Sequence, residues 1–249
     1  MAGRRRGDVP RRQSEIPRVP SMAETDSRTK GQGPRRIHRP RLTIVIGTNG
    51  AGKSTWCSKH ENELPTAFYD ADSIANSLGD WNDRHNQIQA ARRVNRALHG
   101  HLATRESFGF ESTYSGRSRP RMVESAARAG YDVHAVFIGT RDAEINVIRV
   151  QKRVAENTGH AVDGDDIRRR WHNAQDNLAR TAHAFTRIDL YDNSGTTYRQ
   201  IAVVRRHGIE HVRPEPPEWA HSLLERIGNM PRAATWRERD DHEQSVVEP

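Results

Sequence analysis

One stretch of the chain reads Ile44-Val45-Ile46-Gly47-Thr48-Asn49-Gly50-Ala51-Gly52-Lys53-Ser54-Thr55. Within it, Gly47, Gly52, Lys53 and Ser54 fit the spacing G-x-x-x-x-G-K-[ST] of a phosphate-binding loop. Residues 42–46 form the apolar run expected of a buried parallel strand, and a helix is expected to begin at Lys53. A Gly-rich turn with a surface lysine is the alternative, but this spacing arises by chance in only about one such chain in a hundred.

The chemistry of this loop follows from its residue types. Glycines let successive backbone amides turn toward phosphate oxygens, and the helix that follows adds its positive end. A lysine at position 53 reaches the terminal phosphates, and a hydroxyl at position 54 holds Mg²⁺. We therefore expect residues 47–55 to bind ATP, with Lys53 acting in catalysis and Ser54 as a metal ligand.

Outward from the loop, strand and helix patterns alternate. Strands are expected at 42–46, 66–70, 107–111, 132–138 and 187–191, and an edge hairpin at 200–206 and 210–212. Helices are expected at 53–62, after Asp72, and at 83–105, 119–130, 141–157, 165–185 and 217–227. In the 83–105 helix, Ile88, Val94 and Leu98 belong to a one-sided apolar stripe. This alternation predicts an α/β fold with a parallel sheet of about five strands flanked by helices.

Two of these strands end in polar residues, where ligands bind in parallel sheets. Tyr69-Asp70-Ala71-Asp72 ends the second strand; Asp72 is a candidate helix N-cap, or a base for a substrate hydroxyl. Phe110-Glu111-Ser112-Thr113 ends the third, where Glu111, Ser112 and Thr113 are candidate substrate contacts or a hydrogen-bonded turn. Only the second strand is expected to supply an acid of the Walker B type.

The segment 141–185 predicts a helical lid. Arg149 and Arg153 lie four residues apart on one helical face, and the Gly-containing connection beyond them includes His160. Arginines that close over a moving phosphoryl group stabilise its charge, so both are candidate catalytic residues. A solvated charged face is the alternative, and it is the favoured interpretation for Arg168, Arg169 and Arg170. His160 is a candidate substrate contact.

Charge is distributed unevenly along the chain. Residues 1–41 contain 12 Lys and Arg against four Asp and Glu, which accounts for the whole net charge of +8. We expect residues 1–40 to be a disordered basic tail, 41–230 the folded domain, and 231–249 a flexible polar tail. Nucleic acid is a possible partner only through the basic tail.

The lack of a long apolar run and of a secretory signal pattern, together with the single Cys57, predicts a cytoplasmic protein without a membrane span. Cys57 is expected to be a small core residue rather than a nucleophile.

Three stretches together resemble the zeta toxin kinases, in particular the compact branch often labelled predicted ATPases. They are the loop with Asp72 beyond it, the Phe110-Glu111-Ser112-Thr113-x-Ser115-Gly116 segment, and Arg149-Val150-x-x-Arg153-Val154 continuing to Gly159-His160-x-Val162 and Asp165-Asp166-Ile167. The resemblance covers roughly residues 41–193. It implies an ATP-dependent kinase of a UDP-N-acetyl amino sugar that blocks cell-wall precursor synthesis, and it makes a protein inhibitor (an antitoxin) a possible partner.

The resemblance also implies roles for single residues: Asp72 as base, Glu111 and Thr113 as sugar contacts, and Arg149 as a phosphate clamp. The family's second arginine falls near His160, where this sequence departs, so either His160 or Arg153 would supply the second charge. Tyr191-Asp192-Asn193-Ser194-Gly195 would lie near the adenine.

Other functions use the same loop. A kinase of another small hydroxylated molecule, or of a nucleic-acid 5′-hydroxyl, would need the same base and lid. A switch or regulatory NTPase is the alternative from another class. Asp192-Asn193-Ser194-Gly195 matches its D-x-x-G motif, but that motif comes late in the chain and no N-K-x-D follows.

Overall fold

A computed structural model describes residues 39–80, 83–157 and 159–229. The expected tails, 1–40 and 231–249, lie outside these residues except for positions 39 and 40. The strands are β1 (Arg41–Ile46), β2 (Phe68–Tyr69), β3 (Phe108–Ser112), β4 (Asp132–Gly139), β5 (Arg187–Asp192), β6 (Arg199–Arg205) and β7 (Gly208–Val212). The helices are α1 (Lys53–Lys59), α2 (Ala71–Leu78), α3 (Arg84–Thr104), α4 (Ser118–Arg128), α5 (Ala143–Ala155), α6 (Gly164–Thr181) and α7 (Glu218–Gly228), with short 3-10 turns at Glu61–Glu63 and Ala182–Ala184.

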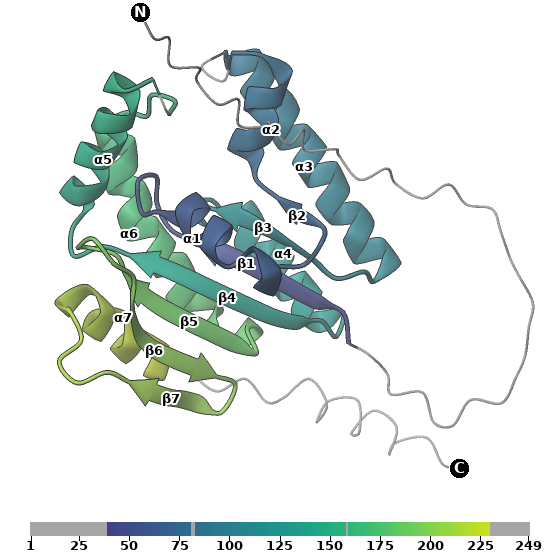
Figure 1. Ribbon diagram of the computed structural model, residues 1–249. Helices are drawn as coiled ribbons and strands as arrows, with labels where there is room; N and C mark the ends of the chain where they lie inside the picture. The colour runs from purple at the N-terminus through teal and green to yellow at the C-terminus, as the bar shows by residue number, and fades with distance from the viewer. Residues whose placement is uncertain (1–38, 81–82, 158, 230–249) are drawn as a thin grey trace, which may run out of the picture. The chain divides into compact units, whose positions relative to one another are not determined.

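The strands form one sheet in the order β2-β3-β1-β4-β5-β6-β7 (Figure 1). Strands β1 to β5 pair in parallel, with β1 between β3 and β4. Strands β6 and β7 add an antiparallel hairpin at one edge. The β1 register sets Ile46 beside Ser112 on one side and Phe137 on the other, so the carboxyl ends of three strands lie next to the loop that follows β1.

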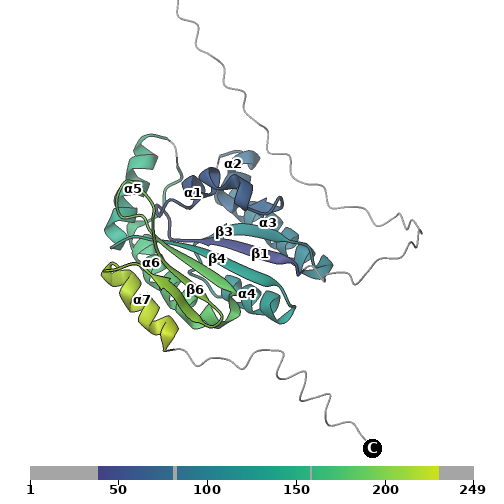
Figure 2. The ribbon, with the colours of Figure 1, turned by 60° about the horizontal axis from the view of Figure 1, so that its bottom comes forward.

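Helices cover both faces of the sheet. In β1, Leu42, Ile44 and Ile46 belong to the main core cluster together with residues of α4, α6 and α7. Val45 points the other way, into a cluster with Trp56 of α1 and Val136 of β4. Figure 2 shows α1 on one side of the sheet and α4 and α6 on the other. Because β1 is apolar toward both faces, its continuous hydrophobic run is explained by burial on both sides.

The expected α/β architecture with helices on both faces is confirmed, but the strand count was too low. The sheet has seven strands and is mixed, because the expected edge hairpin joins it as β6 and β7. The stripe expected on α3 is only partly right: Val94 and Leu98 are buried, whereas Ile88 is 43% exposed. No helix in the described part of the chain is long and apolar enough to cross a membrane.

Candidate active site

The loop after β1 has the backbone geometry that phosphate binding requires. Gly52 adopts φ 97°, a left-handed conformation that disfavours side chains, and it stands at the N-terminus of α1 without a side chain to cap that helix. A Cβ at Gly47 would lie 2.7 Å from the Ile138 carbonyl oxygen, so only glycine fits there. The Lys53 Nζ lies 3.4 Å from the Thr48 carbonyl oxygen, arching back over the loop.

Side chains of the turn between β5 and β6 donate hydrogen bonds to the backbone of this loop. The Asn193 side chain donates to the Ala51 carbonyl oxygen at 2.8 Å, and the Tyr198 hydroxyl donates to the Gly52 carbonyl oxygen at 2.7 Å. Asp192 is 4% exposed and accepts from Ser194 Oγ and Trp219 Nε1. The D-x-x-G match is thus engaged in structural hydrogen bonds, and the expected place of residues 191–195 near an adenine stays a prediction.

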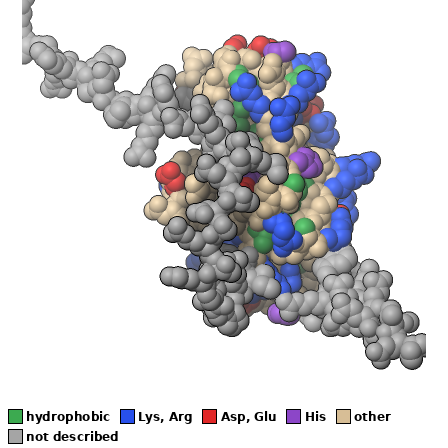
Figure 3. Space-filling view, turned by 90° about the vertical axis from the view of Figure 1, so that its right-hand side faces the viewer, with side chains coloured by type: hydrophobic (Ala, Val, Ile, Leu, Met, Phe, Trp, Pro, Cys, Tyr) green, Lys and Arg blue, Asp and Glu red, His purple; other side chains and the backbone are tan. Residues whose placement is uncertain are grey.

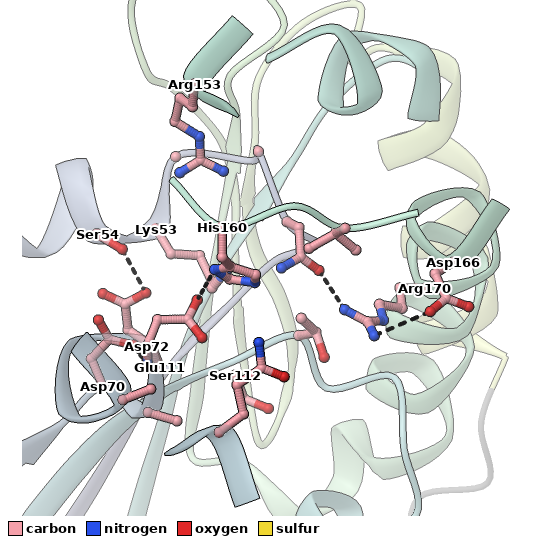
Figure 4. A pocket seen from close by; sticks show the side chains of 18 of the residues that line it. Lys53, Ser54, Asp70, Asp72, Glu111, Ser112, Arg153, His160, Asp166 and Arg170 are labelled. Carbon is pink, nitrogen blue, oxygen red and sulfur yellow. Dashed lines mark hydrogen bonds and ion pairs between the residues drawn. The ribbon is translucent and has the colours of Figure 1, made fainter. Parts of the chain in front are cut away.

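Ser54 and Glu111 meet beside the loop. The Ser54 hydroxyl donates to Glu111 Oε2 at 3.1 Å, a contact drawn in Figure 4. Burial is the main cause that raises the Glu111 pKa, and the charge of Lys53 opposes that rise. The strand β3, which is the neighbour of β1, also carries an acid near its end, and Glu111 lies against the loop serine, so it is a second candidate for a Walker B-type acid that the sequence expectation overlooked.

The Ser54 and Glu111 pair fits a magnesium ion. Hydroxyl and carboxylate oxygens are the donors that Mg²⁺ prefers, and Mg²⁺ usually needs only one or two protein ligands beside phosphate oxygens and waters. A divalent cation would also offset the cost of holding a charged Glu111 in a buried position. No group of three or more His, Cys, Asp or Glu side chains that could hold a metal ion is found among the described residues.

Asp70 and Asp72, one residue apart after β2, have different environments in the structure. Asp70 is the N-cap of α2, since its carboxylate accepts from the Asp72 and Ser73 amides and from the Ser73 hydroxyl. The expectation that Asp72 could cap this helix was therefore wrong by two residues. Asp72 lies in the first turn of α2, its side chain is 62% exposed, and His160 Nδ1 lies 3.8 Å from its Oδ2.

Helices α5 and α6 form a hairpin on the other side of the pocket. Val147 and Val150 of α5 pack against Ile167 of α6, which holds the two helices together. Arg153 from α5, His160 from the connection and Arg170 from α6 all line the pocket. In Figure 4, Arg153, Lys53 and His160 are directed toward the space bordered by Asp72 and Glu111. The predicted lid thus brings positive charge to the loop.

Arg149 has a different environment from Arg153. Its guanidinium donates to the Asn193 carbonyl oxygen at 2.8 Å and to the Gly195 carbonyl oxygen at 2.9 Å. These contacts tie α5 to the turn that braces the phosphate loop. Arg149 is not among the residues that line the pocket, so its expected role as a phosphate clamp stays a prediction.

A pocket of about 530 Å³ joins these parts, and it is strongly polar. It is lined by Asn49, Gly50, Gly52, Lys53, Ser54, Thr55, Asp70, Ala71, Asp72, Ala75, Gln87, Glu111, Ser112, Thr113, Arg119, Arg153, His160, Ala161, Val162, Asp163, Asp166 and Arg170. Thr113 also contacts Ser115, hydroxyl to hydroxyl, at 3.0 Å. The structure therefore brings together Lys53, Asp72, Arg153, His160 and the Glu111 to Thr113 segment, as the sequence predicted.

Sequence reasoning missed two pocket arginines. Arg170 was interpreted as part of a solvated face, but its Nη1 donates to Asn49 Oδ1 at 2.9 Å, and its Nη2 lies 3.5 Å from Asp166. Arg119 was treated only as the start of a helix. No local pattern marks either residue, because each reaches the pocket through the packing of elements far apart in the chain.

Two solved structures of multi-protein systems align with most of this chain. The crystal structure of the AvrRxo1-ORF1:-ORF2 complex with ATP aligns with a TM-score of 0.58 at 13% identity, covering 85% of this chain and 73% of that one. The PezAT chromosomal toxin-antitoxin system of the human pathogen Streptococcus pneumoniae aligns at 15% identity with a TM-score of 0.49, covering 86% and 89%. At 13% identity, the likeness to the AvrRxo1-ORF1:-ORF2 complex concerns the fold alone.

A third solved structure is the Pnkp1/Rnl/Hen1 RNA repair complex, at 20% identity and a TM-score of 0.48. The alignment covers 59% of this chain, and this chain spans about half (48%) of that one. None of the curated proteins matches the sequence. The family described as AAA domain, however, matches residues 42–181, from β1 through the end of α6. This match includes the phosphate loop, both acidic strand ends and the α5–α6 hairpin, and the chain therefore belongs to the AAA domain family.

Proposed function

We propose that this protein is an ATP-dependent kinase that phosphorylates a hydroxyl of a UDP-N-acetyl amino sugar, in the manner of the zeta toxins. One observation carries the proposal: the exposed carboxylate of Asp72 lines the same pocket as Lys53 and the arginines of the α5–α6 hairpin. This carboxylate does not cap α2, because Asp70 accepts the hydrogen bonds at the start of that helix. In a switch NTPase a carboxylate at this place would activate water instead of a substrate hydroxyl, so the acceptor assay below separates the two classes.

In the proposed reaction the substrate hydroxyl lies between Asp72 and the γ-phosphorus of ATP. Its proton passes to the Asp72 carboxylate as the oxygen attacks, and the bond between the γ-phosphorus and the bridging oxygen of ADP breaks. Lys53 and Arg153 stabilise the charge on the transferred group, and Arg170 holds Asn49 of the loop in place. Ser54 and Glu111 would hold Mg²⁺, which supplies further neutralisation of phosphate charge.

His160, in the connection between α5 and α6, is placed to couple closure of this hairpin to the orientation of Asp72. It lies beside Asp72 across the pocket mouth, so closure of the α5–α6 hairpin would orient this carboxylate as well as exclude water. Ser112 and Thr113 offer hydroxyls to the sugar. A protein inhibitor that covers this mouth would be consistent with the resemblance to toxins.

The test is an assay with γ-labelled ATP, Mg²⁺ and UDP-N-acetylglucosamine. The proposal predicts label on the sugar nucleotide, none with Lys53→Ala, and strong loss with Asp72→Asn. Label found only in free phosphate would favour a hydrolase or switch and would contradict the proposal.

One observation favours a second candidate, a kinase of nucleic-acid 5′-hydroxyls. Helix α3 has no acidic residue in 21 positions, and Arg92, Arg93 and Arg96 are exposed on it. Lys and Arg side chains gather on this side of the molecule (Figure 3), and Gln87 of the same helix lines the pocket. A single strand could follow this surface with its end in the pocket.

An oligonucleotide with a 5′-hydroxyl, offered in the same assay, separates the two candidates. Label on the oligonucleotide, with a rate that falls steeply as salt rises, would favour the second candidate. Label on the sugar nucleotide alone would favour the first.

A further inference from the structure

Arg119 is a half-buried cation on the acceptor side of the pocket. It is the second residue of α4 and lines the pocket together with Ser112 and Thr113. Its guanidinium carbon lies 5.0 Å from the centroid of the Phe110 ring, and Nη1 lies 4.0 Å from the Met122 sulfur. The side chain is therefore held against the end of β3 by an aromatic ring and a thioether, neither of which carries charge.

In the described part of the chain, Arg119 has no acidic partner. Within residues 39–80, 83–157 and 159–229, no carboxylate forms an ion pair with this side chain, whereas Arg170 lies against Asp166. The Arg119 pKa is lowered by burial, with no carboxylate acting in the opposite direction. Holding a guanidinium out of water without an anionic partner is costly, so the site favours a ligand that brings negative charge.

The shape of the group indicates which anion. A guanidinium presents a planar fork of donors that matches two phosphate oxygens, and stacking on an aromatic ring fixes the orientation of that fork. The phosphates of ATP are accounted for by the loop around Lys53, which comes from a different part of the pocket lining than β3 and α4.

We propose that Arg119 binds a phosphate group of the acceptor, so that the substrate is a phosphorylated or nucleotide-linked alcohol rather than a neutral one. This inference rests on the proposed function for the identity of the pocket as a kinase acceptor site. The phosphate could belong to a nucleoside diphosphate sugar or to the first phosphodiester of a polynucleotide. Both sources present the same chemistry to Arg119.

Direct binding tests the site without turnover. Protein containing ¹⁵N-labelled arginine is saturated with Mg²⁺ and a non-hydrolysable ATP analogue, then titrated with inorganic phosphate while the Nε resonance of Arg119 is followed. We expect this resonance to shift, and Arg119→Gln to bind phosphate at least about tenfold more weakly, which is about 1.4 kcal/mol. Arg121→Gln, an exposed arginine on the same helix, is the matched control and should bind like wild type.

Equal phosphate affinity in wild type and Arg119→Gln would overturn the proposal, as would an Arg119 resonance that does not move. If Arg119→Gln does not fold, the wild-type titration and Arg119→Lys, which keeps the charge but loses the fork, decide the question. Arg119→Lys should bind phosphate more weakly than wild type, and unchanged binding in this variant would contradict the role of the fork.

A kinetic comparison separates this inference from the proposed substrate. Wild type should have a KM for UDP-N-acetylglucosamine far below that for free N-acetylglucosamine, and Arg119→Gln should raise the former about tenfold or more while leaving the KM for ATP unchanged. A 5′-hydroxyl dinucleotide, which carries one phosphodiester, distinguishes the second source. If neither sugar is phosphorylated, the proposed substrate is wrong. The phosphate titration then still tests whether Arg119 binds phosphate.

Discussion

Two acids separated by one residue have opposite environments at the end of β2. The Asp70 carboxylate accepts hydrogen bonds from two backbone amides and a hydroxyl at the start of α2, and it therefore acts as the N-cap of that helix. Asp72 has its side chain at the pocket and a histidine of the lid beside it. Asp72, whose carboxylate is not used to cap the helix, is therefore the acid placed to meet a substrate hydroxyl.

A matched pair of substitutions tests this division. Asp72→Asn should lower kcat by about 10²–10⁴-fold, the usual contribution of a general base, with little change in ATP affinity. Asp70→Asn is the control, because asparagine caps helices as well as aspartate does, and it should retain most of the activity. Steady-state kinetics and nucleotide binding measure both; full activity in Asp72→Asn would show that the base is another residue.

Glu111 carries a second prediction at this scale. Burial raises its pKa above the ordinary value of 4.5, so the folded state holds the proton more tightly than the unfolded chain. The stability that this group contributes is complete below its ordinary pKa and is lost as pH rises through its folded pKa. Glu111→Gln should therefore raise Tm at pH 7.5 without nucleotide, with a gain that disappears near pH 4, while it lowers activity by about 10²-fold or more.

Glu106 is the natural control for this measurement. A hydrogen bond from His101 lowers the Glu106 pKa, so its contribution has the opposite sign and is present above the ordinary pKa. Glu106→Gln should leave Tm unchanged or slightly lower at pH 7.5. Thermal melts at both pH values compare the two variants, and a lower Tm for Glu111→Gln at pH 7.5 would contradict the burial argument.

At the scale of elements, the lid and the β5–β6 turn act on the phosphate loop from two sides. Arg149 of α5 holds the turn through two carbonyl groups, and that turn holds the loop through Asn193 and Tyr198. Arg149 is thus placed to position the loop through the turn, while Arg153 and Arg170 line the pocket itself.

This difference has a kinetic signature. If Arg149 positions the loop, Arg149→Ala should raise the KM for ATP several-fold and destabilise the fold by about 1–3 kcal/mol, because two carbonyl groups lose charged donors. The kcat at saturating ATP should change little. A clamp on the transferred phosphate would instead lower kcat by about 10³-fold with unchanged stability, and that outcome would support the role implied by the resemblance.

The helices and strands also show which features of the fold a local sequence pattern can predict. The order of strand, loop and helix around Lys53 was predictable, because glycine spacing and an apolar run specify it within 14 residues. The β6–β7 hairpin was visible as a pattern, but its place in the sheet depends on pairing with β5. Ile88 fits a helical stripe and yet is 43% exposed, so the apolar spacing identifies the buried face of α3 only at Val94 and Leu98.

Candidate site residues divide in the same way. Lys53, Ser54, Asp72 and Glu111 were found because a motif or a strand end marks them. Arg170 and Arg119 were not, since tertiary packing alone brings them to the pocket. The capping role of Asp70 was missed because either acid of the Asp-x-Asp pair suits an N-cap, and the exact start of a helix is the least predictable feature of its pattern.

For the molecule as a whole, nucleotide binding and stability should be coupled. Mg²⁺·ATP contacts the loop, Glu111 and the lid in this account, and a ligand that binds only the folded state stabilises it by about 2.7 kcal/mol at 100 times its Kd. Adding an ATP analogue with Mg²⁺ should raise Tm by several degrees. Lys53→Ala should abolish most of the increase, and an equal increase in that variant would mean that the nucleotide binds elsewhere.

The central claim is that the loop at Lys53 holds a triphosphate whose γ-phosphorus faces Asp72. A crystal structure with Mg²⁺ and a non-hydrolysable ATP analogue tests this most directly. The account predicts the γ-phosphate between Lys53 and the Asp72 carboxylate, with Ser54 and Glu111 on the metal side and Arg119 free to meet the acceptor. A structure with Asp72 turned away from the γ-phosphorus, or with the triphosphate outside the loop, would contradict it.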